Sequence, residues 1–342
     1  MSLVHGRPQA RRGEARLERA RPERALGPVT IAWLFPGQGS QSVGMGRALV
    51  ESSAAAAAIL ARTDVALGES LSTLIFEGPA ENLTLTANAQ PAILAVSCAV
   101  LAAMRERTPA LALPAFVAGH SLGEYSALVA VEALSLEDAA RLVRARGVAM
   151  QSAVAPGVGA MSAILGADRE VVEAICVEAR QGEVVAPANF NAPGQIVIAG
   201  HVAAVARACA LAAARSARAV PLNVSAPFHC SLMAPAARAL EARLADVHIA
   251  PPCRPVVANF DGQANSDANR VKELLVNQVD GAVRWEESIR LMAASGVTHA
   301  LEIGPGKVLA GLVRRICKEI KVLSVGDLAS LDCLPAFLAE AA

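Results

Sequence analysis

Aromatic residues are scarce in this chain of 342 residues: Phe, Trp and Tyr together make up 3% of it. Because strands favour aromatic side chains whereas alanine and leucine favour helices, this shortage argues against an all-β fold. Net charge is absent as well, since 31 basic residues balance 31 acidic ones. The sequence therefore gives no overall electrostatic basis for binding nucleic acid or an anionic membrane surface.

The cysteines lack a pairing pattern. There are seven, an odd number, with no Cys-x-x-Cys pair and no His/Cys cluster at the spacing of metal ligands. Such usage is typical of reduced thiols in a cytosolic protein and argues against structural zinc. No apolar run is both long and uninterrupted enough to cross a bilayer. We therefore expect a cytoplasmic protein that binds neither a metal ion nor a membrane.

Residues 1–28 differ from the rest of the chain. They contain seven arginines with interleaved glutamates and no apolar pattern. A transit peptide would be poor in acidic residues, and a secretory signal would need an apolar centre. We predict a disordered arginine-rich extension, or a stretch that precedes the true start codon.

The strongest motif lies in Phe116–Leu128, FVAGHSLGEYSAL. An apolar run, the pentapeptide Gly-His-Ser-Leu-Gly and a run with alanine and leucine predict a strand, a tight turn and a helix. In such a turn the flanking glycines let the backbone bend, so that Ser121 projects beside the amide groups of a helix N-terminus. This arrangement is typical of a serine that forms an acyl-enzyme.

Strand and helix patterns alternate through most of the chain. The expected elements are a strand from Val29, helices over Ala48–Leu67 and Ala89–Arg107, strands over Pro255–Phe260 and Thr298–Gly304, and a basic C-terminal helix. Such alternation predicts an α/β protein with a largely parallel sheet. The glycine-rich loop around Gln38 leaves the first strand at its carboxyl end, where open α/β sheets bind ligands.

The order of the predicted strands and helices changes between residues 155 and 225. Patterns of strand, helix, strand, strand, helix and strand follow one another there, and Asp168 is placed to cap the first of these helices. This βαββαβ order is the ferredoxin-like arrangement. We predict a small ferredoxin-like domain over 155–225, inserted into a larger α/β domain that comprises 29–154 and 226–342.

A serine hydroxyl is a weak nucleophile at neutral pH and needs an adjacent base, most often histidine. His229, in a proline-interrupted loop of the larger domain, is the expected base. His120 adjoins the serine and should point away from the partner of the nucleophile. We expect structural roles or none for the other four histidines, His5, His201, His248 and His299.

An acid that could complete a catalytic triad is not evident. In hydrolases with this turn the acid follows a strand between the serine and the histidine, but the acids between Ser121 and His229 fall on predicted helices or in a turn of the small domain. This favours a dyad in which backbone carbonyls or an amide orient the imidazole.

Three arginines follow the serine helix, Arg141, Arg144 and Arg146. A buried arginine beside the serine would pair with a carboxylate and so select an acyl group that carries a second acid. Most arginines on such a helix are solvated, and spacing alone does not choose among the three.

Seven segments together resemble a known family: FPGQGSQSVGMG, GHSLGEYSAL, RARGVAMQ, NFNAPGQIVIAG, SAPFHCSLM, VRWEESI and GPGKVLAGL. They run in order from Ile31 to Ile316. The family is the malonyl-CoA:acyl carrier protein transacylase of bacterial type II fatty acid synthesis, with related acyltransferases of polyketide synthesis. The resemblance implies a hydrolase-like large domain with a ferredoxin-like insertion.

The resemblance also implies roles for residues at matching positions. Ser121 matches the nucleophile, His229 the general base and Arg146 the arginine that holds the malonyl carboxylate. Gln38 and Leu122 match residues whose backbone amides form the oxyanion hole.

Further positions match the family pattern or depart from it. Gln278 matches the residue whose main-chain carbonyl orients the histidine, and Phe228 resembles members specific for malonyl groups. Glu132 stands where the family usually has glycine, and we expect it to adjust a helix end.

The implied reaction is a ping-pong transfer of malonyl from malonyl-CoA, through a seryl ester, to the phosphopantetheine thiol of acyl carrier protein, with no cofactor. We expect a monomer that docks the acidic carrier on the basic C-terminal helix. The candidates on that helix are Lys307, Arg314, Arg315, Lys318 and Lys321, with Arg314 and Arg315 the best of them. The alternatives are a discrete acyltransferase or acyl hydrolase serving a polyketide synthase, an esterase or thioesterase, and a carrier-binding module without catalysis.

Overall fold

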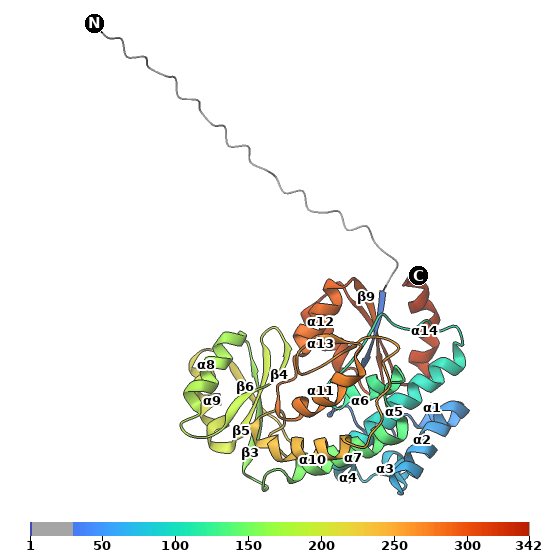
Figure 1. The fold of residues 1–342 in the computed structure, drawn as a ribbon, viewed down its shortest axis with the longest axis horizontal. Coiled ribbons are helices and arrows are strands. Elements are labelled where there is room, and N and C mark those ends of the chain that lie inside the picture. Colours follow the sequence, from blue (N-terminus) through green and yellow to red (C-terminus); the bar gives the residue numbers. More distant parts are fainter. Residues whose placement is uncertain (2–29, 342) are drawn as a thin grey trace.

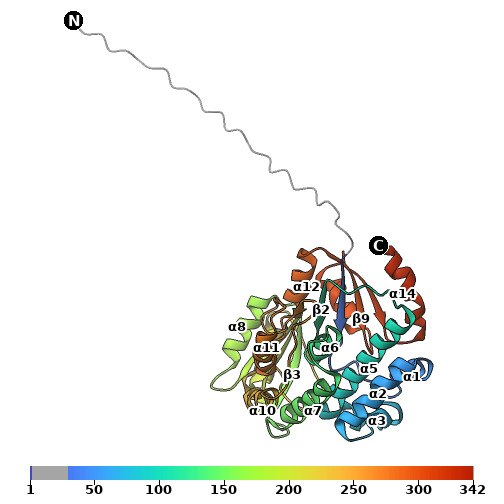
Figure 2. The same ribbon diagram turned by 45° about the vertical axis from the view of Figure 1, so that its right-hand side comes forward.

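The computed structural model describes Met1 and residues 30–341 (Figure 1). The predicted arginine-rich extension lies outside this described range, apart from Met1. The described chain forms a larger body and a smaller lobe, each built on its own β-sheet, as Figures 1 and 2 show from two sides.

The larger body is built on a six-stranded sheet in the order β10-β9-β1-β2-β7-β8. Its strands are β1 (Thr30–Phe35), β2 (Phe116–Gly119), β7 (Val256–Val257), β8 (Ala264–Asn265), β9 (Val297–Ile303) and β10 (Lys321–Val325). All neighbours pair in parallel except β7 with β8. Since β1 and β2 are adjacent and parallel, the loops that follow them, which carry Gln38 and Ser121, emerge at the same edge.

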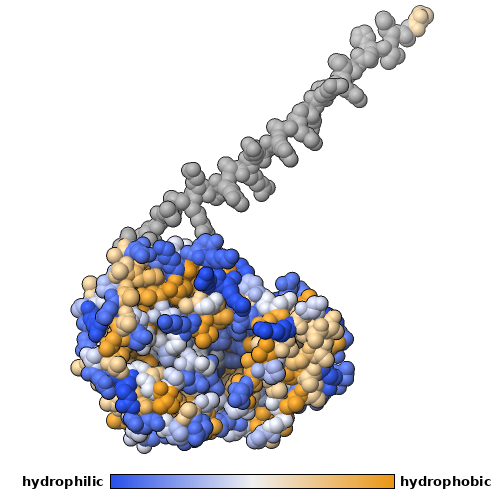
Figure 3. Space-filling model, turned by 180° about the vertical axis from the view of Figure 1, so that it is seen from behind, coloured by the Kyte–Doolittle hydropathy of each residue, from blue (hydrophilic) through white to orange (hydrophobic). Residues whose placement is uncertain are grey.

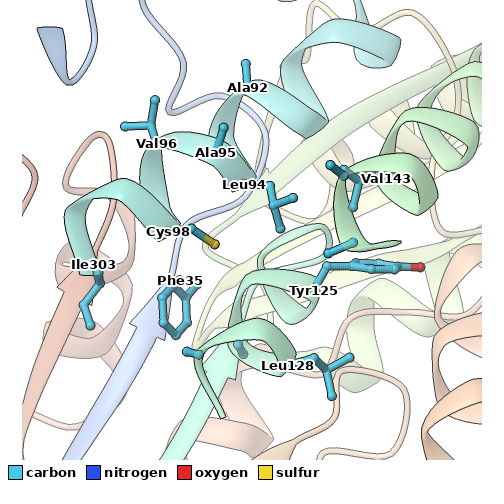
Figure 4. Close-up of a cluster of buried hydrophobic side chains, with 14 of the residues drawn as sticks. Phe35, Ala92, Leu94, Ala95, Val96, Cys98, Tyr125, Leu128, Val143 and Ile303 are labelled. Atoms are coloured by element: carbon cyan, nitrogen blue, oxygen red, sulfur yellow. The ribbon is translucent and has the colours of Figure 1, made fainter. Parts of the chain in front are cut away.

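Helices cover both faces of this sheet, so the strands read as continuous apolar runs. Side chains alternate across β1: Trp33 and Phe35 join one buried cluster, while Ala32 and Leu34 join another. Figure 4 shows the first cluster, where Phe35 lies between residues of the flanking helices.

The helices that contribute to the first cluster come from both halves of the chain. They are α1 (Arg47–Ser52), α2 (Ala54–Leu67), α3 (Leu71–Glu77), α4 (Ala80–Thr84), α5 (Thr86–Arg107), α6 (Gly123–Ala130), α7 (Leu136–Ser152), α10 (Ala234–Leu244), α11 (Ala268–Asp280) and α14 (Leu328–Glu340). The opposite face is covered by α12 (Trp285–Ala294) and α13 (Val308–Ile316). The short 3₁₀ helix Ser231–Met233 precedes α10.

The smaller lobe has a four-stranded antiparallel sheet in the order β4-β5-β3-β6. Its elements are β3 (Gly159–Leu165), α8 (Arg169–Ala179), β4 (Val185–Ala192), β5 (Gln195–His201), α9 (Val202–Ala214) and β6 (Arg218–Pro221). The predicted βαββαβ order is confirmed. Asp168 occupies the N-cap position of α8, but the predicted capping hydrogen bond is absent.

The lobe is joined to the larger body by backbone pairing. The Phe190 amide donates to the Val283 carbonyl at 2.9 Å, and the Val283 amide donates to the Ala188 carbonyl at 2.9 Å. Because hydrogen bonds run in both directions between β4 and the segment before α12, they attach the lobe to the larger body.

Several predicted elements differ from those observed. The helix predicted over Ala48–Leu67 is broken at Ser53, whose extended backbone and side chain cap α2. The strand predicted over Pro255–Phe260 is only Val256–Val257, because the following residues turn toward the site. The structure also has α3, α4, β10 and α14, which the pattern did not indicate.

The structure corrects the predicted placement of two lysines and explains the unusual residue at position 132. The chain continues past α13 into β10, so Lys318 and Lys321 do not lie on a C-terminal helix as predicted. Glu132 follows the end of α6 with φ of 60°. This left-handed conformation favours glycine, which gives a physical reason for the glycine that the family pattern has there.

Helix α5 is the one described helix long and apolar enough to cross a membrane. Within its apolar window 83% is buried inside the fold, so α5 is a core helix here. On the face drawn in Figure 3, hydrophobic and hydrophilic residues of the described chain are intermingled.

The α5–α7 contact leads to a stability prediction. A Cβ atom added at Gly147 in α7 would lie 2.6 Å from the carbonyl oxygen of Thr86 and 2.8 Å from Cα of Ala87. Since both are backbone atoms, Gly147→Ala should lower the free energy of unfolding by about 1–3 kcal/mol. Urea denaturation measures this loss.

Gly311→Ala is the matched control, because Gly311 lies in α13 and its added Cβ would meet nothing within 4 Å. Helix propensity predicts a gain of about 0.5–1 kcal/mol there. A Gly147→Ala protein as stable as the wild type would show that the two helices separate at little cost.

Candidate active site

A cavity of about 350 Å³ lies between the two sheets. Its walls come from the loop after β1, the turn after β2, helices α5, α7 and α13, strands of the smaller lobe, and the loop that carries His229. The lining includes Gln38, Ser121, Arg146, Phe228 and His229. The structure thus brings five of the predicted site residues to one cavity.

Ser121 occupies the turn between β2 and α6 with φ of 51°, an unfavourable value for a residue other than glycine. Packing around the turn is tight, since a Cβ on Gly123 would lie 2.3 Å from the Phe35 carbonyl oxygen. Two side chains hold the serine backbone: Asn259 Oδ1 accepts from its amide at 2.6 Å, and Gln278 Nε2 donates to its carbonyl at 2.9 Å.

His229 lies against the serine. Its Nε2 is 2.8 Å from Ser121 Oγ, and its Nδ1 is 2.8 Å from the main-chain carbonyl of Gln278. A carbonyl oxygen only accepts, so Nδ1 carries the proton and Nε2 is free to accept one from the serine hydroxyl. A backbone carbonyl therefore stands where a triad would have a carboxylate.

The electrostatic surroundings keep His229 neutral. Burial disfavours the imidazolium and the Arg146 guanidinium repels it, and together they lower the pKa of His229 to about 3. A neutral imidazole is the form that can act as a base.

Arg146 is 2% exposed, and its guanidinium is directed at the serine. Nη1 donates to Gln90 Oε1 at 2.8 Å, while Nη2 donates to Gln278 Oε1 at 2.8 Å and to Ser121 Oγ at 2.9 Å. Its Nε has no partner within the described residues. A cation is thus fixed beside the Ser121 hydroxyl with hydrogen-bonding capacity unused, a combination that suits an anionic group.

The other two arginines of α7 have different surroundings. Arg141 is exposed and pairs with Asp138. Arg144 is half-buried and donates to Glu69, to Asn88 Oδ1 and to the Ala87 carbonyl. Neither lines the cavity, so Arg146 alone of the three faces it.

The loops that hold Gln38 and Leu122 lie side by side, since the His120 amide donates to the Phe35 carbonyl at 3.0 Å. Neither the Gln38 nor the Leu122 amide is among the donors of the turn and loop hydrogen bonds in the described chain. Both are therefore available to an oxyanion, and their predicted role stays a prediction.

The remaining predicted residues lie nearby. His120 also lines the cavity, and its Nε2 lies 2.8 Å from Oδ1 of Asn191 in β4 of the smaller lobe. Arg314 and Arg315 are exposed in the last turn of α13, and Arg315 donates to Gln195 at the cavity wall.

Sequence reasoning missed three buried polar residues: Gln90, Glu124 and Asn259. Gln90 and Asn259 fell within segments interpreted as ordinary helix and strand. Glu124 offered a signal, because it is the sole charged residue in the apolar stretch Leu122–Val131 that follows the serine.

Comparisons with known proteins identify the class. Residues 32–335 match the family model described as the acyl transferase domain. The chain is an acyltransferase. It is 46% identical over 309 residues to the malonyl CoA-acyl carrier protein transacylase of Haemophilus influenzae, covering 90% of this chain and 99% of that one. It is 48% identical over 299 residues to the enzyme of the same name from Bacillus subtilis, covering 87% and 93%.

Solved structures agree with these relatives. An acyl carrier protein S-malonyltransferase from Vibrio cholerae matches with a TM-score of 0.86 at 46% identity, covering 89% of this chain and 99% of that one. A malonyl-transacylase in complex with a type II PKS acyl-carrier protein, PlMCAT:AntF, matches with a TM-score of 0.87 at 42% identity, covering 91% and 99%. The chain belongs to the malonyl-CoA:acyl carrier protein transacylase family.

The protonation state of His229 can be tested directly. An ordinary imidazole titrates near pH 6.5, whereas a pKa lowered to about 3 leaves the His229 ring neutral from pH 8 down to pH 5. Histidine NMR across this range should show no titration of His229. In Arg146→Gln the repulsion is removed, so the midpoint should rise.

A wild-type midpoint near 6.5 would contradict this account of the site. The shift also has a stability consequence of defined sign. Below pH 6.5 the unfolded chain binds a proton at this position that the folded chain does not, so stability falls as the pH decreases.

Proposed function

We propose that the protein transfers a malonyl group from malonyl-CoA to the phosphopantetheine thiol of acyl carrier protein, supplying extender units for fatty acid biosynthesis. The family membership supports the reaction class. The observation that carries the proposal is the buried Arg146 guanidinium, 2.9 Å from Ser121 Oγ, because an esterase would have no use for a fixed cation at that point.

In the first half-reaction Ser121 attacks the malonyl thioester while its proton passes to His229 Nε2. The amides of Gln38 and Leu122 stabilise the oxyanion, which is usually the largest electrostatic contribution in such a step. Arg146 holds the free carboxylate of the malonyl group. The C–S bond then breaks, the thiolate takes the proton from His229, and a malonyl-serine ester remains.

The second half-reaction reverses these steps with a new thiol. His229 accepts the proton of the phosphopantetheine thiol, the thiolate attacks the ester, and the proton returns to Ser121 Oγ. The carbonyl of Gln278 orients the imidazole in both halves. Phe228, which lines the cavity, limits bulk beside the acyl α-carbon and so favours malonyl over methylmalonyl.

One alternative is supported by an observation. The similarity to a malonyl-transacylase solved with a type II PKS carrier keeps a polyketide carrier as a second candidate acceptor. An acyl hydrolase is disfavoured, because hydrolases with this turn orient the histidine with a carboxylate, and Gln278 occupies that place here.

The finer assignments of fold and setting belong to the same proposal. We infer a hydrolase-like larger domain with a ferredoxin-like insertion, and the βαββαβ order of the smaller lobe supports the latter. We also propose that the protein is a cytoplasmic monomer.

Intact mass after brief incubation with malonyl-CoA or acetyl-CoA tests the proposed chemistry. The wild type should gain a malonyl adduct and Ser121→Ala none. Arg146→Ala should lose the malonyl adduct by about 100-fold, since the substrate carboxylate loses its buried partner, and should accept acetyl instead. Release of free acid and CoA by a wild type that carries no adduct would contradict the proposal.

Carrier docking can be tested separately. Arg314 is exposed on the helix whose Val308, Leu309 and Leu312 line the cavity. Arg314→Glu should raise KM for the acidic carrier by roughly three- to tenfold, with a weaker salt dependence, and leave acylation by malonyl-CoA unchanged. Steady-state transfer assays measure this.

Arg243→Glu is the matched control, because it makes the same charge change on exposed α10, which does not line the cavity. Equal KM values for the two variants would place the docking surface elsewhere.

A further inference from the structure

Glu124 is a buried acid that the reaction outlined above does not use. It lies in the first turn of α6, three residues after Ser121, and is 3% exposed. Among the described residues only Glu124 and Glu302 are buried carboxylates. Burying an acid is costly unless its oxygens are hydrogen-bonded or its charge is compensated, so its contacts are informative.

A single carboxylate oxygen of Glu124 accepts two hydrogen bonds. Its Oε2 accepts from the Asn259 backbone amide at 3.0 Å and from Gln278 Nε2 at 2.8 Å. Gln278 Nε2 also donates to the Ser121 carbonyl at 2.9 Å. Both hydrogens of that side-chain amide are therefore used, one on the acid and one on the serine turn.

These two acceptors fix which end of the Gln278 side chain faces Arg146. If the amide were flipped, its oxygen would face the Glu124 carboxylate and the Ser121 carbonyl, and three acceptors would be opposed. In the observed orientation Oε1 accepts from Arg146 Nη2 at 2.8 Å. Glu124 thus acts on Arg146 through Gln278.

The second contact of Glu124 reaches the serine turn. Asn259, whose amide Glu124 holds, accepts from the Ser121 amide at 2.6 Å and donates from Nδ2 to the Gly119 carbonyl at 2.7 Å. One carboxylate therefore fixes the partners of both the Ser121 amide and the Ser121 carbonyl.

The surroundings of Glu124 act on its charge in opposite directions. Burial raises the pKa of Glu124 to about 7, while the two hydrogen bonds and the Arg146 charge act in the opposite direction. Asp261 adds a weak like-charge contribution that raises it. Oε2 makes acceptor contacts only, so these contacts hold whether the acid is ionised or carries its proton on Oε1.

We propose that Glu124 is a positioning residue for acyl selection: through the Gln278 side chain it orients the Arg146 guanidinium toward the acyl carboxylate, and through Asn259 it holds the turn of Ser121. The inference rests on the proposed function, because it assumes that Arg146 receives the carboxylate. A residue with this role favours malonyl over acetyl groups, whereas a residue that merely supports the fold would affect both acyl groups alike.

The test compares the rates of malonyl and acetyl adduct formation by intact mass, with thermal unfolding to verify that each variant is folded. Glu124→Ala removes both contacts and should lower the malonyl rate about 10- to 100-fold, with a smaller loss for acetyl. In Glu124→Gln the amide oxygen can take the place of Oε2, so the malonyl-to-acetyl ratio should stay within about a factor of three. Glu241→Gln, an exposed position on α10, is the control for the charge change.

Gln278→Leu keeps the main-chain carbonyl on His229 and removes the side-chain link, which keeps the test valid if Glu124→Ala does not fold. Gln278→Leu should lower the malonyl-to-acetyl rate ratio as Glu124→Ala does. The variant that carries both substitutions should show little further decrease, because the two residues act in series. A folded Glu124→Ala or Gln278→Leu with the wild-type ratio overturns the inference. A Glu124→Gln variant whose malonyl-to-acetyl rate ratio falls as far as that of Glu124→Ala also overturns it.

The two proposals fail in different ways. A wild-type enzyme that forms no malonyl adduct refutes the proposed function itself. A wild type that forms the adduct, together with variants that lower malonyl and acetyl rates equally, refutes only the role of Glu124.

Discussion

The buried charge of Arg146 is the constraint on which the site depends. A guanidinium with 2% exposure needs hydrogen-bond acceptors from the protein, and Gln90, Gln278 and Ser121 accept three hydrogen bonds from its two terminal nitrogens. Burial, with a further contribution from this charge, lowers the pKa of His229 and keeps its imidazole neutral. In the proposed reaction, substrate selection and the protonation state of His229 both involve this cation, so we expect a change at Arg146 to alter both.

The fold places the groups around that cation. Parallel pairing of β1 with β2 brings the Gln38 loop and the Ser121 turn to one edge of the sheet. The tight α5–α7 contact at Gly147 places the preceding residue, Arg146, against Gln90 of α5. Asn259 and Gln278, from distant segments, then hold the serine backbone at a φ that the residue would otherwise avoid.

Much of this arrangement could be predicted from the sequence. Alternating strand and helix patterns gave the α/β class and the βαββαβ order, and the glycine-flanked Ser121 gave the turn. The polar network under the turn could not be predicted, because Asn259 and Glu124 act through backbone and side-chain contacts between segments far apart in the chain. Asn259 was hidden in an apolar run that predicts a strand, and the run leaves the sheet after Val257. The choice of Arg146 over Arg141 and Arg144 required family resemblance, since helical spacing does not determine which of the three is buried.

The most direct test of the central claim is a single-turnover chase. Malonyl-enzyme is isolated free of malonyl-CoA, mixed with excess holo acyl carrier protein, and both proteins are followed by intact mass. The account predicts that the malonyl group appears on the carrier as the enzyme returns to its unmodified mass, and that the ester persists when carrier is omitted. Loss of the ester to free malonate at the same rate with and without carrier would contradict it and make the protein a hydrolase.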